Sequence, residues 1–352
     1  MSVFFRFISA IYLKSFFIIF FSLVLFFVGV DLLLNFKNLP DSANLDILYV
    51  IFLSFSAMSY ILPVSLVFAL IMSLISMIRS NELVSLYALG LSKNHVILYP
   101  FLWALFFCLV YVGLNSTPFA YAENYKGNIL NNAVLANQSD NIFLKYNEQF
   151  IYISKLDPLQ NKVMEMKIFD IKDLKLTQVS EISSAFFDRD HWVFDNVKEI
   201  YLPQDFNLSK EGLKLAEYDK TQALYGFKPR IIEGAASVNS NSIIDAIEGI
   251  RIFSQQGINT NALKTELYIL IFAPFFAPFL MLIMYYFFPA IGRFFNLAFI
   301  GFVFLIVTLV VWGVLFLFLR LSENGVLIPE LGIIFPVLCL SLAALFLFFK
   351  HR

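Results

Sequence analysis

Charged residues are scarce in this chain, and their scarcity sets its class. Only 14% of the 352 residues are charged, whereas 59% are hydrophobic and the mean hydropathy is +0.76. A water-facing surface normally needs about a quarter of the residues to be charged. The composition therefore predicts an integral membrane protein. The formal net charge of -1 also argues against a nucleic-acid-binding protein.

Residue types that usually build reactive or metal-binding sites are also few. Cys108 and Cys339 lie in separate apolar runs, which excludes a structural disulfide in a water-exposed domain. His95, His191 and His351 are far apart in sequence, so a histidine metal cluster is not expected. Neither a Gly-x-x-x-x-Gly-Lys-Ser/Thr phosphate loop nor a Gly-x-Ser-x-Gly motif occurs. We therefore expect a non-catalytic protein without a metal or cofactor.

Long apolar runs are what the chain has in abundance. Each of six runs can cross the hydrocarbon core of a bilayer as a helix. An interfacial helix is expected over 1–15, before the first span, and Pro63 is expected to kink the second. Asp31 is the main ionisable residue inside a run, which makes an ion-coupled carrier a weaker interpretation. The runs cover 16–34, 47–78, 96–114, 267–288, 297–319 and 331–349.

Between the third and fourth runs, over 119–261, the composition becomes that of a water-facing domain. Residues 149–154 and 164–168 alternate apolar and polar side chains, as strands do, and Asp188 to His191 separates two further strands as a hairpin. We expect an antiparallel β domain of sandwich or jelly-roll type. A helix returning to the membrane is predicted over 242–256 from the spacing of Ile243, Ile247, Ile250 and Phe253.

The distribution of basic residues predicts the orientation. If the six spans alternate, seven bases outside the β domain all fall on one side, and the short loops of the opposite side hold acids such as Asp41, Asp46 and Glu323, so the basic side is expected to be cytoplasmic. Both termini are expected in the cytoplasm, and the β domain on the far side of the membrane. The chain thus divides into a transmembrane half (1–118), a β domain with its return helix (119–261) and a second transmembrane half (262–352). The bases are Arg6, Lys14, Arg79, Lys93, Arg293, Lys350 and Arg352.

Residues 79–93 connect the second and third runs and form the candidate functional segment, called here the connector. Leu83, Leu86, Tyr87 and Leu91 recur at helical spacing, Asn81 or Ser80 can cap the helix, and Gly90 supplies a stop. A short helix between two spans is well placed to receive a push from another protein. The acid near its start, Glu82, is also explained by the helix macrodipole alone, and taken by itself the residue favours that account.

Other candidate residues have simple structural explanations. Lys37 and Arg320 can anchor helix ends at the level of the lipid headgroups. Leu62, Leu66 and Phe68 can pack one helix against another. Physical reasoning from the residues stops at a six-span protein with an external β domain.

The whole pattern resembles the LptF/LptG permease family, the membrane subunits of the bacterial lipopolysaccharide exporter. The order of three spans, a β domain and three spans carries the resemblance over essentially the whole chain. Asn81-Glu82-Leu83-Val84 and Ala88-x-Gly90 stand between spans two and three. Three details look closer to LptG than to LptF: Phe150-Ile151-Tyr152-Ile153, the segment 242–257, and the end at Lys350-His351-Arg352.

The resemblance implies an ABC transporter in the bacterial inner membrane, with the β domain in the periplasm. The implied partners are an LptF-like permease in a heterodimer, an LptB-like ATPase dimer and an LptC-like periplasmic protein that receives lipopolysaccharide. In that family the connector is a coupling helix that docks in a groove of the ATPase. Glu82 matches its acid, and its packing positions are matched by Leu83, Leu86, Tyr87 and Gly90.

The resemblance also implies a lipid cavity between the two permeases, open to the outer leaflet. Acyl chains need an apolar wall, for which Leu62, Leu66 and Phe68 are the candidates. Lipid A phosphates need bases, and the candidates are Lys37, Lys126 and Arg320. The family places two arginines just after span three, where this chain has Glu123 and Lys126, which argues against strong headgroup pairing by this subunit.

Two other functions stay open from the sequence. An ABC permease for another lipid or for lipoproteins would also carry an external domain, but those chains usually place it after span one. A membrane scaffold would use the β domain only to bind periplasmic proteins. Copurification of an ATPase that lipid stimulates would distinguish a transporter from a scaffold.

Overall fold

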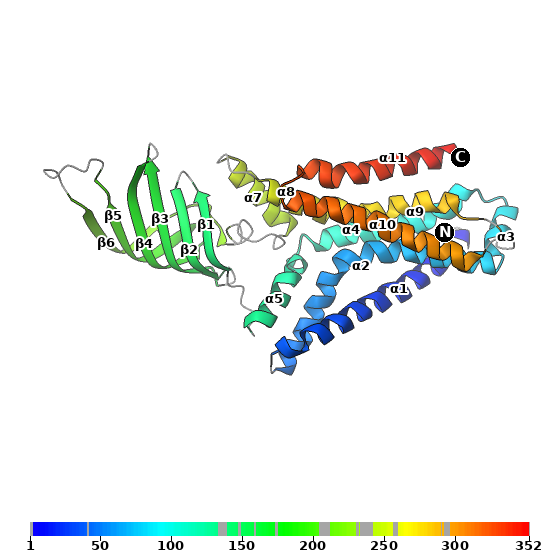
Figure 1. The fold of residues 1–352 in the computed structure, drawn as a ribbon, viewed down its shortest axis with the longest axis horizontal. Coiled ribbons are helices and arrows are strands. Elements are labelled where there is room, and N and C mark those ends of the chain that lie inside the picture. The colour runs from blue at the N-terminus through cyan, green and yellow to red at the C-terminus, as the bar shows by residue number, and fades with distance from the viewer. Residues whose placement is uncertain are drawn as a thin grey trace. The chain divides into compact units, whose positions relative to one another are not determined.

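Six helices of the protein are long and apolar enough to cross a membrane, as the six apolar runs predict. This count covers the residues that the computed structural model describes, which are 3–40, 42–132, 139–146, 149–157, 160–172, 175–203, 212–229, 232, 242–255, 260–289, 291 and 296–351. The chain forms two compact units (Figure 1). The helical unit comprises Met1–Asn38, Val50–Phe119 and Leu267–Arg352, and the sheet unit comprises Leu39–Tyr49 and Ala120–Glu266.

The first helix differs from the expectation. In place of a separate interfacial helix before the span, α1 runs without a break over Val3–Asn35. Its first turns carry the residues that pack inward, because Ile8, Tyr12 and Phe16 recur every four positions and are buried. The Tyr12 hydroxyl donates to the carbonyl oxygen of Leu66 at 3.3 Å. One side of the stretch assigned to the membrane surface therefore packs against other helices of the unit.

Among the six spans, the second is the most buried within the helical unit and the fifth is the least buried. The most apolar part of α2 (Ala43–Arg79), which continues as a helix through Pro63, is the most buried of the six. That of α10 (Leu297–Glu323) is the least buried. The two helices approach closely at Gly301, where an added Cβ would lie 2.6 Å from Ile75 Cδ1. Most of the α10 surface is thus available to lipid or to another subunit.

The fourth span is interrupted by two prolines. It comprises α8 (Asn261–Phe272), a 3-10 turn (Ala273–Phe275) and α9 (Phe276–Phe287). Pro278 has no N–H to give to the carbonyl of Pro274, four residues earlier. The Cys108 thiol of α4 (Lys93–Leu114) donates to that carbonyl, at 3.4 Å. A neighbouring helix thus covers the carbonyl that the proline leaves free, which makes an interrupted helix tolerable inside a membrane.

The sixth span begins with a π-helical turn at Glu330–Ile334 and continues as α11 (Phe335–Lys350). Gly332 in this turn permits a close approach to α10, because a Cβ there would meet the Phe318 carbonyl oxygen at 3.1 Å. Packing between neighbouring helices joins α9 to both α11 and α4, and α4 to α1. Helix α9 therefore lies between helices from both halves of the chain.

The sheet unit contains six antiparallel strands that are neighbours in the order of the chain. The predicted hairpin is confirmed, since Asp188 pairs with His191 and Arg189 takes a positive φ of 54°. No second sheet of a sandwich occurs among the residues described. The strands are β1 (Ser139–Tyr146), β2 (Gln149–Asp157), β3 (Lys162–Lys172), β4 (Lys175–Asp188), β5 (His191–Tyr201) and β6 (Lys214–Ala223).

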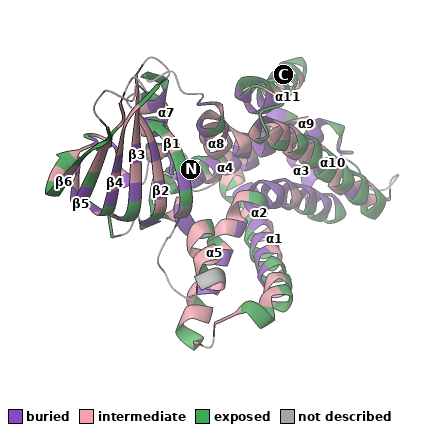
Figure 2. Cartoon of the chain, turned by 60° about the vertical axis from the view of Figure 1, so that its left-hand side comes forward, coloured by how far each residue is buried: buried purple, intermediate pink, exposed green. Residues whose placement is uncertain are grey.

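One face of the sheet is an apolar core, as the alternation of side chains requires (Figure 2). The chain after β6 covers part of this face with Phe227, which is fully buried. Two side chains of the sheet bind the backbone of that segment. Trp192 Nε1 donates to the Phe227 carbonyl at 2.6 Å, and the Tyr146 hydroxyl donates to the Tyr225 carbonyl at 2.6 Å.

Helices flank the sheet in the sequence. The return helix is confirmed as α7 (Ile243–Gln255), although Ile247 is exposed and Gly249 lies on the buried side instead. A 3-10 turn (Pro118–Tyr121) and α5 (Ala122–Asn132), which the sequence did not predict, precede β1. The Tyr121 hydroxyl donates to Asp245 of α7. Of the bases used for orientation, Arg293 and Arg352 lie outside the described residues.

Candidate functional site

The connector folds as a short helix, α3 (Glu82–Ala88), that follows α2 after only Ser80 and Asn81. Asn81 takes a left-handed backbone, with φ 59° and ψ 12°, and its N–H donates to the Ile78 carbonyl at 3.1 Å. Asparagine tolerates this conformation better than most residues. The predicted side-chain cap is wrong for Asn81, which makes no such hydrogen bond. Its backbone instead forms a tight corner that links α3 to α2.

The other end of α3 stops at Gly90, as predicted. Gly90 has a φ of +86°, its N–H donates to the Tyr87 carbonyl at 3.0 Å, and the N–H of Leu91 donates to the Leu86 carbonyl at 3.2 Å. These two bonds form a Schellman motif, which glycine favours. The Ser92 hydroxyl then caps α4 by accepting from the His95 N–H at 3.3 Å. Both ends of α3 are thus fixed to spans by short, hydrogen-bonded corners.

Three of the predicted connector residues anchor α3 to the helical unit. Leu83 and Leu86 are buried, at 2% and 5% exposure. The hydroxyl oxygens of Tyr87 and Tyr285, at the end of α9, lie 2.7 Å apart and share a hydrogen bond. Burial raises the pKa of the Tyr87 phenol because it disfavours the charged phenolate. Tyr87 therefore acts as a neutral hydrogen-bonding group.

The opposite side of α3 is exposed and could contact another protein. Ser85, Ala88 and Leu89 are exposed, and Leu89 reaches 68%. Glu82 is partly exposed at the start of the helix. Sequence reasoning selected the apolar side of α3 and missed Ser85, Ala88 and Leu89. Their helical spacing, complementary to that of Leu83 and Leu86, was the signal that could have identified them.

A second group of contacts joins the start of α4 to the ends of α9 and α11. Asn94, only 8% exposed, donates from Nδ2 to the Phe348 carbonyl at 3.0 Å. Its Oδ1 accepts from the Tyr286 hydroxyl at 2.8 Å. The Tyr286 ring stacks on His351 with 4.7 Å between centroids. These contacts place the connector and the chain's C-terminal end at one end of the helical unit (Figure 1), as six alternating spans require.

The candidate acyl-chain residues differ in accessibility. Leu66 is fully buried and Leu62 is 7% exposed, so both pack inside this chain's own helical unit. Phe68 is partly exposed. In this conformation Phe68 offers more surface to a lipid than the other two. Contacts of Leu62 and Leu66 with an acyl chain stay predictions.

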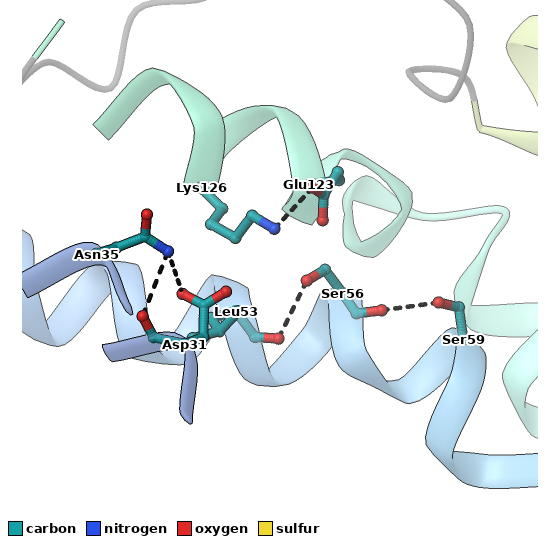
Figure 3. A network of polar contacts seen from close by, with 7 residues as sticks. All are labelled: Asp31, Asn35, Leu53, Ser56, Ser59, Glu123 and Lys126. Atoms are coloured by element: carbon teal, nitrogen blue, oxygen red, sulfur yellow. Dashed lines mark hydrogen bonds and ion pairs between the residues drawn. The ribbon is translucent and has the colours of Figure 1, made fainter. Parts of the chain in front are cut away.

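Two of the three candidate phosphate-binding bases already have acidic partners. Lys126 Nζ lies 2.7 Å from Glu123 Oε1 (Figure 3), and Arg320 Nη1 lies 2.7 Å from Glu323 Oε2. Lys37, in the 3-10 turn after α1 (Phe36–Asn38), is exposed. Among the ion pairs of the described residues, none includes Lys37.

The ionisable residue of the first span is also bound within its own helix. Asn35 Nδ2 donates to Asp31 Oδ1 at 3.0 Å (Figure 3), one helical turn along α1. In addition, Arg320 lies over the Phe316 ring at 4.9 Å. Both contacts join residues four positions apart in the same helix.

Comparison with known families gives one match that covers nearly the whole chain. The family model described as "Lipopolysaccharide export system permease LptF/LptG" matches residues 6–350. The match includes the connector, the six strands and all six long apolar helices, apart from the first three residues of α1. A search of curated proteins finds no match.

Proposed function

Because the chain belongs to the LptF/LptG family of lipopolysaccharide export permeases, we propose that it is one permease subunit of an ABC transporter. This transporter extracts lipopolysaccharide from the bacterial inner membrane and passes it to a periplasmic protein bridge. The chain itself is non-catalytic, and a separate ATPase dimer hydrolyses ATP. A second permease, LptF-like if this chain is the LptG-like member, completes the membrane part.

The observation that carries this proposal is the two-sided α3. Its buried side, with Leu83, Leu86 and Tyr87, fixes it to the helical unit. Its exposed side leaves Ser85 and Leu89 for an ATPase. The corners at Asn81 and Gly90 are short and hydrogen-bonded, so they connect α3 rigidly to its neighbours. A displacement of α3 therefore also displaces α2 and α4.

Movement of α2 and α4 explains how ATP hydrolysis could expel a lipid. When the ATPase dimer closes, the two connectors approach each other, and the helices attached to them narrow the cavity between the permeases. A lipid held against apolar helices then moves toward the periplasm. Both termini lie in the cytoplasm, and the sheet unit lies in the periplasm, where an LptC-like protein receives the lipid.

Glu82 provides the test of this function. In the purified complex with its permease and ATPase partners, reconstituted with lipopolysaccharide, Glu82→Gln should lower lipid released per ATP hydrolysed. The protein should still insert and fold, because loss of an acid at a helix N-terminus costs only about 0.3–1 kcal/mol. Glu330→Gln, which removes an acid from the first turn of the sixth span, is the matched control.

The outcomes separate the proposal from its rivals. Unchanged release per ATP in Glu82→Gln would leave only the macrodipole role for this acid. Delivery of a lipoprotein, and not lipopolysaccharide, by the wild-type complex would favour the other ABC permease function. Absence of any copurifying ATPase would favour a scaffold.

A further inference from the structure

The end of α9 carries two neighbouring tyrosines whose hydroxyl groups bind different parts of the connector region. Tyr285 shares a hydrogen bond with Tyr87 of α3. Tyr286 donates to Asn94 in the first turn of α4. Tyr285 and Tyr286 are 3% and 8% exposed. Adjacent residues of a helix point about 100° apart, so one turn of α9 holds two elements at once.

These contacts matter because of the order of the chain. The backbone joins α3 only to α2 and α4, both in the first transmembrane half. The second half begins more than a hundred residues later, after the sheet unit, and among the described residues it meets α3 through the hydrogen bond between the Tyr285 and Tyr87 side chains. Apolar packing alone has no preferred direction and permits sliding. Hydrogen bonds between buried hydroxyl groups fix direction and distance, and breaking them leaves unpaired polar atoms.

The second half has a further link at the same place. Asn94 donates to the Phe348 carbonyl near the end of α11, and Tyr286 stacks on His351, which follows α11. Asn94 therefore binds α9 with its oxygen and α11 with its nitrogen. Span four and span six are both connected to the start of span three.

We propose that Tyr285 and Tyr286 are positioning residues that make α9 and α11 follow the connector when the ATPase moves it. Both transmembrane halves then move together and not the first half alone. This inference rests on the proposed function, because it requires that force enters through α3. It assigns the transmission step to named hydroxyl groups outside the connector.

The experiment removes these hydroxyl groups and keeps the rings. Tyr285→Phe, Tyr87→Phe and the double variant are prepared in the full complex with the partner permease and ATPase, in vesicles containing lipopolysaccharide. ATP hydrolysis and lipid transferred to the periplasmic acceptor are measured together, with thermal unfolding as a check on folding. Tyr268→Phe is the matched control. Tyr268 lies in the same span as Tyr285, but its hydroxyl binds Glu330, which is in the first turn of the sixth span.

Each single variant should hydrolyse ATP within about twofold of wild type and transfer roughly threefold to tenfold less lipid per ATP, the range expected for loss of one hydrogen bond. The double variant should be no worse than either single one, because only one bond is lost. Tyr286→Phe, which removes the bond to Asn94, should also lower transfer per ATP. A purely structural role predicts reduced thermal stability with an unchanged ratio of lipid to ATP.

Wild-type transfer per ATP in Tyr285→Phe and Tyr87→Phe would overturn the inference and leave the proposed function intact. If either fails to fold, the other still tests the same bond from its opposite side. Failure of the unsubstituted complex to release lipopolysaccharide would instead overturn the proposed function.

Discussion

Gly90→Ala tests whether the corner that ends α3 is needed for coupling. Gly90 has a φ of +86°, and no atom lies within 4 Å of the position that a Cβ would occupy. The substitution therefore creates no clash. Its cost is conformational, about 1–2 kcal/mol for an L-residue in the left-handed region. That corresponds to a shift of roughly 5-fold to 30-fold between the native corner and alternatives.

Three matched variants separate this cost from other effects. Gly325→Ala introduces a Cβ at φ +71°, also with open space, in the loop after α10. Gly113→Ala lies within α4, again with open space, and should be neutral or stabilising by up to about 1 kcal/mol. Gly90→Asn should recover part of the loss, because asparagine tolerates positive φ.

The assays are thermal unfolding of the purified protein and lipid transferred per ATP in the reconstituted complex. Gly90→Ala and Gly325→Ala should lose similar stability. Gly90→Ala alone should lower transfer per ATP, because only Gly90 ends the segment that receives the force. The reasoning is refuted if Gly90→Ala is as stable as wild type, or if asparagine is no better than alanine at this position.

Two further predictions concern polar contacts away from the connector. Cys108→Ala should destabilise the helical unit by roughly 0.5–1 kcal/mol, because the Pro274 carbonyl loses its hydrogen-bond donor. Cys108→Ser keeps a donor and should unfold near the wild-type temperature. An equal loss of stability in both variants would contradict this prediction. The hydrogen bond to Glu199 raises the pKa of Tyr201 from 10.0 to about 12, so its contribution to stability is present below pH 10 and is lost as the pH rises through 12. In a phenolate absorbance titration, Glu199→Gln should lower this pKa, with Tyr201→Phe identifying the signal.

Features that depend on near neighbours in the chain were accessible to sequence reasoning. The Gly90 stop needed only a helical pattern followed by glycine. The hairpin at Asp188 to His191 needed only two alternating runs. The pairing of Glu123 with Lys126 at (i, i+3) was also readable, but only once α5 is known to be a helix. The segment of α5 has few apolar residues, so its helical pattern could not be recognised from the sequence.

Features that join distant segments were not accessible. Nothing in the sequence links Tyr285 to Tyr87, or Cys108 to Pro274, because these contacts depend on how helices pack. Asn81 could adopt either of two local structures, and the surrounding helices determine which one forms. Its residue type suits a side-chain cap and a left-handed corner equally, and the close succession of α2 and α3 requires the corner.

The sequence alone determined that this protein has six spans, an inserted β domain and a short connector helix, because span length and side-chain periodicity are local properties. Only the tertiary structure decided which side of the connector is free. Packing buries Leu83 and Leu86 and engages the hydroxyl of Tyr87, which leaves Ser85, Ala88 and Leu89 outside. Helical periodicity identifies the two faces of the connector, but the helices that surround it determine which face is buried and which is exposed.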